Sequence, residues 1–456
     1  MAKLFGTDGV RGLANKEITP ELAMIIGRAG AYTLAGHMGR QPKVLIGTDT
    51  RLSADMLEAA LVAGLCSVGA EVYRAGNIPS PAMAFLVRHY KMDAGCMLSA
   101  SHNPMEDNGI KFFDGKGYKL SDEMEEKIEA LIKSETLIKS ESDKIPRPIG
   151  KEVGRAFLCD RAVGDYVDYL TGLCGAISFK GLKVALDCAN GACCEAAPET
   201  FKRLGAEIYP IHYKPNGINI NEACGSTHLA SLQEYVKANN LDIGLAFDGD
   251  GDRVLCVDDL GAELDGDIIM AICGLALKKK GDLKNNGIVA TVMSNMGLQI
   301  FCDKEGITLH RAKVGDRYVI QDMKEGGYSL GGEQSGHIIF HDYNTTGDGI
   351  LTGLQLLTIL KESGQKLSEL RKIVEVMPQV LLGAKLGSSG MTDISKNKKI
   401  DDAIKELEKK LEGTGRILVR PSGTEPIVRV MIEGRDQSVI KKWAEDLVEL
   451  IEKEMT

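Results

Sequence analysis

The apolar positions of this chain follow one arrangement three times, at residues 43–73, 183–209 and 288–309. Each copy has a short apolar run, a small polar turn, a stretch with helical apolar spacing, a glycine and a second apolar run. Such units are typical of β-α-β structure, in which helices cover the faces of a mostly parallel sheet. The glycine supplies the left-handed conformation that ends a helix. We therefore predict three related α/β domains.

The end of the chain departs from this arrangement. Two apolar runs, 417–420 and 427–432, flank a turn, and the spacing predicts an amphipathic helix over 437–453. These elements indicate a small α+β domain. The stretch 134–153 is charged, carries two prolines and breaks the apolar periodicity, as a linker does. The predicted domains are residues 1–150, 151–256, 257–368 and 369–456.

One further apolar run follows each copy and leads into an unusual polar loop. The runs are 94–98, 241–247 and 328–330. The loops are Ser99-Ala-Ser-His-Asn-Pro104, Asp248-Gly-Asp-Gly-Asp-Arg253 and Gly332-Glu-Gln-Ser-Gly-His337. A nucleophile-like loop, a carboxylate cluster and a polar loop at equivalent strand ends indicate one shared active site. The chain is therefore predicted to be an enzyme.

The composition is that of a soluble globular protein, with 456 residues, 44% hydrophobic and 26% charged. A net charge of −9 argues against broad nucleic-acid binding. No apolar run approaches the roughly 20 residues of a membrane-spanning helix, and the first residues lack the apolar core of a signal peptide. Eleven cysteines without a C-x-x-C pair suit a reducing compartment. We expect a cytoplasmic protein with neither nucleic acid nor membrane as a partner.

Asp248, Asp250 and Asp252 alternate with glycines directly after an apolar run. Three carboxylates this close repel one another unless a cation lies among them, and compact oxygen ligands suit Mg²⁺. An EF-hand loop begins with the same spacing, but its sixth position is Arg253 here instead of glycine. An acidic surface turn is the other alternative. We favour a metal site, because solvated turns seldom place three carboxylates after a buried strand.

Ser101 follows a buried run beside His102, and Asn103-Pro104 fixes the turn. A hydroxyl near a metal can accept or donate a phosphoryl group. Taken alone, however, the loop favours a serine that caps a helix or forms a turn. No G-x-S-x-G pattern supports acyl transfer. The residues leave the role of His102 open between catalysis and packing.

The loop Arg420-Pro-Ser-Gly-Thr-Glu-Pro426 joins the last two apolar runs, and Arg429 follows it. Arginine forks, hydroxyls and glycine N–H groups form anion sites. We interpret this loop as a phosphate site, and a plain hairpin is the alternative. No Walker A or G-x-G-x-x-G pattern implies ATP or NAD.

Single polar residues elsewhere carry a weaker signal. Arg11 and Lys111 lie in or near glycine-containing loops, where they can reach a ligand, but surface cations are the default. Glu333, Ser335 and His337 offer the donors and acceptors that sugar hydroxyls require. As isolated residues they are equally compatible with an ordinary polar loop.

Taken together, these loops resemble those of the α-D-phosphohexomutases. Phe5-Gly-Thr-Asp-Gly-Val-Arg-Gly12 precedes the four loops quoted above, and all five stand in the family's order over essentially the whole chain. Gln334 resembles the branch that acts on glucosamine phosphates. The resemblance implies three related mixed α/β sheet domains and a C-terminal α+β domain around a central cleft. It also implies Mg²⁺ as cofactor, a phosphosugar substrate and, by analogy, a homodimer.

The resemblance implies roles for individual residues as well. Ser101 would carry a phosphoryl group, which Mg²⁺ bridges to the three aspartates. The candidates for charge stabilisation and proton handling are Arg11, Lys111 and His102. The implied substrate-binding residues are Arg253, which also braces the aspartates, Glu333, Ser335 and His337. The residues expected to hold the phosphate that is not reacting are Arg420, Ser422, Gly423, Thr424 and Arg429.

The implied reaction interconverts glucosamine 6-phosphate and glucosamine 1-phosphate through a 1,6-bisphosphate, and it feeds the synthesis of UDP-N-acetylglucosamine and cell-wall precursors. Glucosamine 1,6-bisphosphate or glucose 1,6-bisphosphate would prime the serine. Phosphomannomutase/phosphoglucomutase activity is the alternative within the family, and a phosphosugar phosphatase is a less favoured one. A catalytically silent phosphosugar-binding protein is a third, against which the complete set of reactive residues argues.

Overall fold

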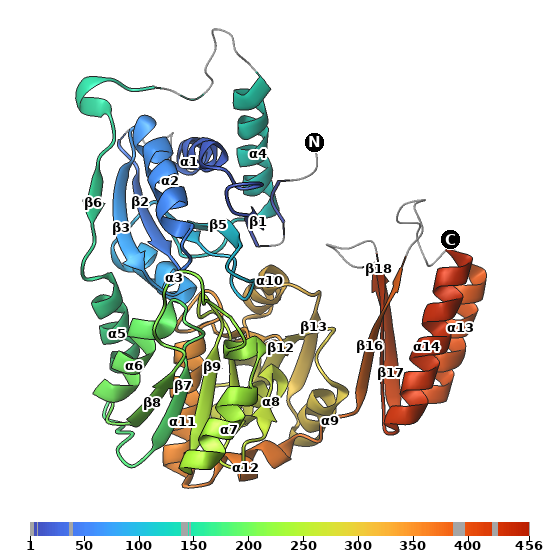
Figure 1. The fold of residues 1–456 in the computed structure, drawn as a ribbon. Coiled ribbons are helices and arrows are strands. Elements are labelled where there is room, and N and C mark those ends of the chain that lie inside the picture. The colour runs from blue at the N-terminus through green and yellow to red at the C-terminus, as the bar shows by residue number, and fades with distance from the viewer. Residues whose placement is uncertain are drawn as a thin grey trace. The chain divides into compact units, whose positions relative to one another are not determined.

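The computed structural model describes residues 4–6, 8–35, 40–137, 145, 147–385, 397–421 and 427–455. The chain divides into two compact units (Figure 1). The first unit comprises Met1–Met293 and Thr308–Lys372, and the second comprises Ser294–Ile307 and Ile373–Thr456. Within the described part of the chain, no helix combines the length and the apolar character needed to cross a membrane.

The first unit begins with a six-stranded sheet of order β1-β5-β4-β2-β3-β6. Its strands are β1 (Val10–Leu13), β2 (Lys43–Thr48), β3 (Glu71–Asn77), β4 (Ala94–Leu98), β5 (Asp107–Asp114) and β6 (Ala156–Leu158). Its helices are α1 (Pro20–Ala35), α2 (Ala54–Ser67), α3 (Ser80–His89) and α4 (Asp122–Leu137). Ile26, Leu61 and Ile128 of three of these helices share one core with Ile46 and Leu98 of the sheet.

Two further sheets complete the first unit, with orders β11-β10-β9-β7-β8 and β13-β12-β14-β15. The second sheet contains β7 (Lys183–Asp187), β8 (Glu207–Ile211), β9 (Ile243–Phe247), β10 (Val254–Asp258) and β11 (Glu263–Leu264). The third contains β12 (Gly287–Thr291), β13 (Thr308–Ala312), β14 (Leu330–Gly332) and β15 (Ile338–Phe340). The remaining helices of this unit are α5 (Ala162–Leu173), α6 (Cys193–Arg203), α7 (Ala230–Asn239), α8 (Gly266–Lys280), α10 (Asp316–Gly326), α11 (Gly349–Ser363) and α12 (Leu367–Leu370).

The three sheets share one strand order, β5-β4-β2-β3 in the first, β10-β9-β7-β8 in the second and β15-β14-β12-β13 in the third. In each, three strands pair in parallel and a fourth pairs antiparallel as a hairpin partner. The glycines expected to end the helices have left-handed φ values of 89° at Gly69, 89° at Gly205 and 61° at Gly306. The prediction of three related mixed α/β domains is confirmed.

Each of the three polar loops lies at the turn of an equivalent hairpin. The strands β4, β9 and β14, which lead into these turns, are buried along their whole lengths. Burial on both faces explains why their sequences are continuous apolar runs without alternation. Residues 99–104 are called the serine loop, residues 248–253 the aspartate loop and residues 333–337 the glutamate loop.

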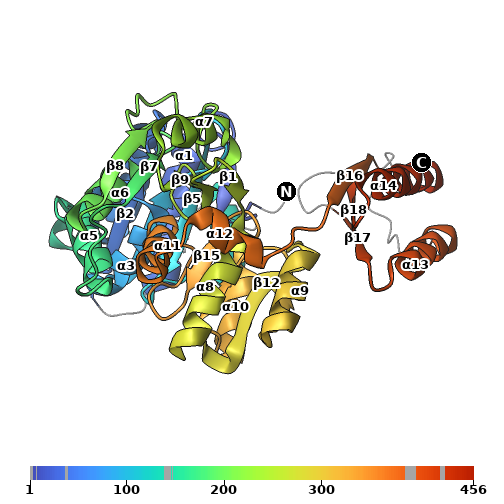
Figure 2. The ribbon, with the colours of Figure 1, turned by 90° about the horizontal axis from the view of Figure 1, so that it is seen from below.

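The second unit is built on an antiparallel sheet of order β16-β18-β17. Its strands are β16 (Gln379–Lys385), β17 (Gly415–Pro421) and β18 (Ile427–Gly434), and its helices are α9 (Met296–Glu305), α13 (Lys398–Leu411) and α14 (Gln437–Glu454). The helices α13 and α14 lie side by side along the sheet (Figure 2). Ile432, Leu407 and Ile451 are buried between these layers. The predicted α+β layout is confirmed, although the sequence analysis did not predict β16 and α13.

Candidate active site

The serine, aspartate and glutamate loops of the first unit meet through direct contacts. Ser101 Oγ donates a hydrogen bond of 2.6 Å to Asp248 Oδ2. Asp252 Oδ2 lies 3.5 Å from Nδ1 of His337 at the end of the glutamate loop. Ser101 and Asp248, 147 positions apart in the sequence, therefore face each other, because equivalent strands deliver them to the same place.

Ser101 has an unusual backbone conformation for a serine. Its φ of 54° lies in the left-handed region, and only 1% of the residue is exposed. Its N–H donates to Ser99 Oγ at 2.9 Å, and its own Oγ lies 3.3 Å from His102 Nδ1. A buried non-glycine residue in this region is strained, and such strain concentrates at functional sites. The hydroxyl is directed at a carboxylate and does not cap a helix.

The three aspartates form a buried group whose oxygens are only partly hydrogen-bonded. Their ligand atoms lie within 4.8 Å of one another. Among the described residues, Asp250 Oδ1 and Asp252 Oδ1 have no hydrogen-bond partner. Burial, followed by repulsion from Asp250 and Asp252, raises the pKa of Asp248 well above its usual range. Buried carboxylate oxygens of this kind are the ligands of hard divalent cations, so the residues present fit a metal ion.

Cations surround the aspartate loop. Lys111, 1% exposed, places Nζ 2.8 Å from Asp250 Oδ2 and 2.9 Å from Asp8 Oδ2. Asp8 also pairs with Arg11 and, at 2.7 Å, with Lys119. Burial acts to lower the pKa of Lys111, but Asp250 and Asp8 outweigh it and the pKa is raised. Lys111 is therefore a buried site residue and not a surface cation.

His102 and Arg253 lie beside the serine and aspartate loops and feel the same charges. The backbone N–H of Arg253 donates to Asp248 Oδ1 at 3.1 Å. The side-chain Nε of Arg253 lies 3.9 Å from Asp252 Oδ1. Burial, Arg253 and Arg11 together lower the pKa of His102 to about 4. His102 is accordingly neutral near pH 7 and a weak base beside the serine hydroxyl.

The glutamate loop presents one carboxylate and one hydroxyl. Glu333 accepts a hydrogen bond of 3.2 Å from Gly315 N and a long one of 3.5 Å from Ser335 Oγ. Both side chains are half-buried. His337 differs from them, since it is 2% exposed and its Nε2 accepts a hydrogen bond of 2.9 Å from Gly347 N. In the neutral form its proton is then on Nδ1, the atom that faces Asp252.

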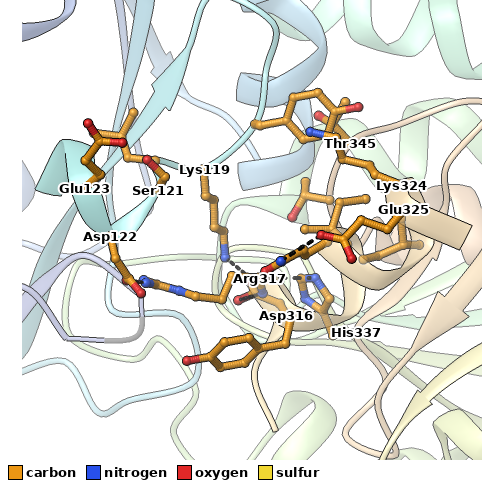
Figure 3. Close-up of a pocket in the computed structure, with 17 residues that line it drawn as sticks. Lys119, Ser121, Asp122, Glu123, Asp316, Arg317, Lys324, Glu325, His337 and Thr345 are labelled. Carbon is orange, nitrogen blue, oxygen red and sulfur yellow. Dashed lines mark hydrogen bonds and ion pairs between the residues drawn. The ribbon is translucent and has the colours of Figure 1, made fainter. Parts of the chain in front are cut away.

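A cavity of about 480 Å³ borders the glutamate loop at His337. Its lining includes Lys119, Asp316 and His337, whose side chains lie close together in Figure 3. Lys119 pairs with Asp316, and its Nζ lies 3.9 Å from Asp252 Oδ2. The cavity thus lies between the segment that follows β5 and helix α10, its walls carry charges of both signs, and Lys119 and His337 connect it to Asp252. The sequence analysis missed Asp8, Lys119 and Asp316.

A second group of possible metal ligands includes residues at the ends of the neighbouring strands β7 and β8. Asp187, His212 and Cys224 also have ligand atoms within 4.8 Å of one another. Here the carboxylate is satisfied, because Asp187 Oδ1 accepts from Ala189 N and Oδ2 accepts from Gly225 N, each at 2.9 Å. His212 Nδ1 lies 3.1 Å from Oδ2.

In the second unit, two arginines face each other across adjacent strands. Arg420 on β17 lies directly opposite Arg429 on β18. In the described structure, Arg420 Nε is buried without a hydrogen-bond partner. Burial, and then the charge of Arg429, lowers the pKa of Arg420. Like charges placed directly opposite destabilise a sheet, so the pair fits an anion. Ser422, Gly423 and Thr424, predicted to join them, lie outside the described residues.

Family models match the chain along most of its length. They are described as Phosphoglucomutase/phosphomannomutase domains: alpha/beta/alpha domain I over residues 2–139, domain II over 164–261, domain III over 265–377 and the C-terminal domain over 362–450. The four models follow one another in the order of the domains in that family.

Curated relatives match the chain from end to end. Phosphoglucosamine mutase of Acetivibrio thermocellus is 55% identical over 455 residues, which covers 100% of both chains. Phosphoglucosamine mutase of Caldicellulosiruptor saccharolyticus is 56% identical over 456 residues, again 100% of both.

Solved structures share the fold at low identity. A phosphoglucomutase/phosphomannomutase family protein of Burkholderia thailandensis has a TM-score of 0.82 and 24% identity, covering 99% of this chain and 97% of its own. N-acetylphosphoglucosamine mutase of Aspergillus fumigatus, solved in complex with GlcNAc-6P and magnesium, has a TM-score of 0.69 and 18% identity, covering 99% and 96%.

Proposed function

The chain belongs to the phosphoglucomutase/phosphomannomutase family, and from this premise we propose that it interconverts glucosamine 6-phosphate and glucosamine 1-phosphate. One observation carries the chemistry: the Ser101 hydroxyl is hydrogen-bonded to a buried aspartate group with two unpartnered oxygens. The names of the full-length relatives support glucosamine phosphate as the substrate.

Asp248, Asp250 and Asp252, with an oxygen on Ser101, would hold Mg²⁺. The ion supplies positive charge that offsets the carboxylates and a phosphoryl group on the serine. The protein supplies the rest of the electrostatics itself. Lys111 and Arg253 lie against the aspartates, and Arg11 is held beside them by Asp8. These cations are placed to stabilise negative charge on a phosphoryl group in transfer.

The proposed reaction runs in two transfers of one phosphoryl group each. In the first, the bond from Ser101 Oγ to phosphorus breaks as a bond from the sugar's 1-oxygen forms, and the proton of the sugar's 1-hydroxyl passes to Ser101 Oγ. The product is glucosamine 1,6-bisphosphate. After the bisphosphate turns around, the bond from the 6-oxygen to phosphorus breaks and the serine ester forms again, while the proton of the Ser101 hydroxyl passes to the 6-oxygen. Glucosamine 1-phosphate leaves, and the phosphoserine is restored.

The remaining residues are assigned to binding. Glu333 and Ser335 present a carboxylate and a hydroxyl, which suit the hydroxyls of a sugar. His337 contributes to this loop through its contact with Asp252. His102 is a candidate for proton handling beside Ser101. We assign the phosphate that is not reacting to Arg420 and Arg429, together with Ser422, Gly423 and Thr424.

Several wider features belong to the same proposal. Glucosamine 1,6-bisphosphate or glucose 1,6-bisphosphate primes the serine, and a homodimer is inferred by analogy with the family. The domain boundaries stay at residues 150, 256 and 368. Eleven free thiols suit a reducing cytoplasm.

The test is isomerisation of glucosamine, glucose and mannose 6-phosphates by the purified protein with Mg²⁺ and catalytic bisphosphate. We expect the highest kcat/KM for glucosamine 6-phosphate. Release of inorganic phosphate is measured in the same samples. A preference for glucose or mannose phosphate would replace the proposed substrate, and phosphate release without isomer formation would replace the mutase by a phosphatase.

A further inference from the structure

Two residues outside the loops that carry the reacting groups hold the backbone of the serine loop. The carbonyl oxygens of Ser101 and Asn103 each accept two hydrogen bonds. One comes from Arg51 Nη2, at 3.1 Å and 2.8 Å respectively. The other comes from Asn221 Nδ2, at 2.9 Å and 3.0 Å. Each NH₂ group thus uses both of its hydrogens on the same two carbonyls.

Arg51 approaches the serine loop from the first sheet. It is 2% exposed, and its Nε donates to Asp49 Oδ2 at 2.9 Å. The same oxygen accepts a hydrogen bond of 2.6 Å from Ser99 Oγ, which in turn accepts the Ser101 N–H. The other NH₂ group of Arg51 donates to Pro104 O and, at 3.0 Å, to Asp107 O. All N–H groups of the guanidinium therefore donate to backbone carbonyls or to Asp49, and none is available to a substrate.

Asn221 approaches from the other side, in a segment of the second domain. It is 8% exposed, has a left-handed φ of 58°, and its N–H donates to Ala189 O at 2.9 Å. The aspartate loop approaches the same carbonyl, since a Cβ at Gly249 would lie 2.5 Å from Ser101 O. The serine loop is thus fixed between Arg51 of its own domain and Asn221 of the next.

These hydrogen bonds restrain the strained backbone of Ser101. A left-handed conformation disfavours an L-residue, and it persists only when its surroundings over-determine it. Four hydrogen bonds to two carbonyls on either side of His102 provide that restraint. Because phosphoryl transfer depends on positioning, small displacements of Ser101 Oγ relative to Asp248 have large effects.

We propose that Arg51 and Asn221 are positioning residues, which set the direction of Ser101 Oγ for phosphoryl transfer without touching the sugar. The inference rests on the proposed function. Its consequence is that domains one and two jointly define the geometry of the phosphoserine, while substrate affinity is set elsewhere.

The test compares substitutions at the contact between the first two domains. Asn221→Leu removes both donors and keeps the size of the side chain, and Arg51 still holds the carbonyls. Because the left-handed φ of residue 221 strains leucine, Asn221→Gly, which removes the donors without that strain, is measured beside it and should show the same loss of kcat. Thr50→Val is the matched control, because Thr50 Oγ1 donates to Asn190 O at 2.6 Å across the same contact but does not touch the serine loop. For each protein we measure the melting temperature, kcat, KM and the ³¹P resonance of the phosphoserine.

We expect Asn221→Leu to lower kcat by about 10- to 100-fold, to leave KM for glucosamine 6-phosphate within about twofold, and to shift or broaden the ³¹P resonance. Thr50→Val should change only the melting temperature. Arg51→Lys, which keeps the charge but loses the fork, should lower kcat further. If Arg51→Lys does not fold, Asn221→Leu decides the matter alone.

Wild-type kcat together with an unmoved ³¹P resonance in Asn221→Leu would overturn the inference. An equal loss of kcat in Thr50→Val would also overturn it, because the loss would then come from packing between the domains. Failure of the proposed function gives a different result. In that case the wild-type protein itself would isomerise none of the three sugar phosphates, and the inference would fall with the function.

Discussion

Two carboxylate groups lie at strand ends of the second sheet, and they differ in what surrounds them. Asp187 ends β7, and both of its oxygens accept backbone N–H groups. Asp248, Asp250 and Asp252 follow β9, and two of their oxygens have no hydrogen-bond partner among the described residues. Asp187 with His212 and Cys224, like the three aspartates, brings its possible ligand atoms within 4.8 Å of one another. The spacing of possible ligand atoms is therefore the same in both groups, and what differs is whether the carboxylate oxygens are hydrogen-bonded.

The difference follows from the physical chemistry of buried charge. A buried carboxylate is tolerated when hydrogen bonds or cations offset its lost hydration. For Asp187 the N–H groups of Ala189 and Gly225 provide that compensation, and the same hydrogen bonds fix the two loops that contain these residues. The aspartate loop obtains only part of it, from Lys111 and Arg253, and the remainder is available to a ligand.

The largest expected effect comes from removing the hydroxyl that faces Asp248. Ser101→Ala should abolish isomerisation, because no other group takes the phosphoryl group, and it should leave the fold and the binding of Mg²⁺ by the aspartates in place. Intact mass should find one phosphate on the primed wild type and none on the variant. Activity near that of the wild type would contradict a covalent mechanism.

The aspartate group itself is tested by Asp250→Asn. One ligand and one charge are lost together, so turnover should fall on the order of 10²- to 10³-fold, and more Mg²⁺ should be needed for half-maximal rate. Without metal, the variant should melt lower than the wild type. Burial and Asp252 act to raise the pKa of Asp250, but Lys111 and Ser80 outweigh them and the pKa is lowered, so the lost attraction exceeds the relieved repulsion. Activity is titrated against Mg²⁺, and melting is followed in EDTA. An unchanged titration would refute the metal assignment.

Arg420 and Arg429 are a pair of like charges of the opposite sign to the aspartates. If a phosphate relieves their repulsion, Arg420→Ala should weaken binding of both monophosphates by about 1.5–3 kcal/mol. The bisphosphate should also escape before it turns, so that the variant needs a continuous supply of it. Calorimetry with glucosamine 6-phosphate and an assay for released bisphosphate measure the two effects. Wild-type affinity and retention would place the phosphate elsewhere.

Asp187→Asn is the matched substitution at the satisfied group. Its amide would turn a donor toward Ala189 N–H or Gly225 N–H, and the unpaired N–H should lower the free energy of unfolding by about 1–3 kcal/mol. The Mg²⁺ titration of activity should not move. Denaturant unfolding and the same titration check both points. A shifted titration with unchanged stability would reverse the comparison.

The smallest expected effect is the pH dependence contributed by His212. The Asp187 carboxylate, 3.1 Å from His212 Nδ1, raises the pKa of His212. Because the pKa of His212 is higher in the folded than in the unfolded state, protonated His212 stabilises the fold. This stabilisation is fully present below about pH 6.5, the pKa of an unfolded histidine, and is lost as the pH rises through the folded-state pKa. The side chain is 31% exposed, so screening keeps the effect below about 1 kcal/mol. The stability difference between wild type and His212→Asn should shrink between pH 6 and 8. A difference that does not vary with pH would contradict the assignment.

Much of the fold was predictable because its signals are local. Apolar runs and helical spacing are patterns of nearby residues, and the glycines at 69, 205 and 306 mark single positions with a left-handed backbone. The spacing of Ile400, Ile404, Leu407 and Leu411 also suffices to predict α13. The three loops were recognisable because their unusual residues are contiguous.

The rest of the site depends on contacts between distant segments. Asp8 and Lys119 are 111 positions apart, and Arg51 and Asn221 meet only at the serine loop. A lone lysine, arginine or asparagine carries no local sign of its partner. The burial that lowers the pKa of His102 is a property of the assembled loops, and no pattern in the sequence reports it.

The left-handed backbone of Ser101 sets backbone strain against chemistry at one position. Glycine is the residue that this conformation favours, but the serine that stands there directs a hydroxyl at Asp248. If that hydroxyl carries the phosphoryl group as proposed, a lineage that needs turnover keeps the strained residue. A lineage released from that need would be expected to drift to glycine rather than to alanine, because only glycine removes the strain along with the hydroxyl.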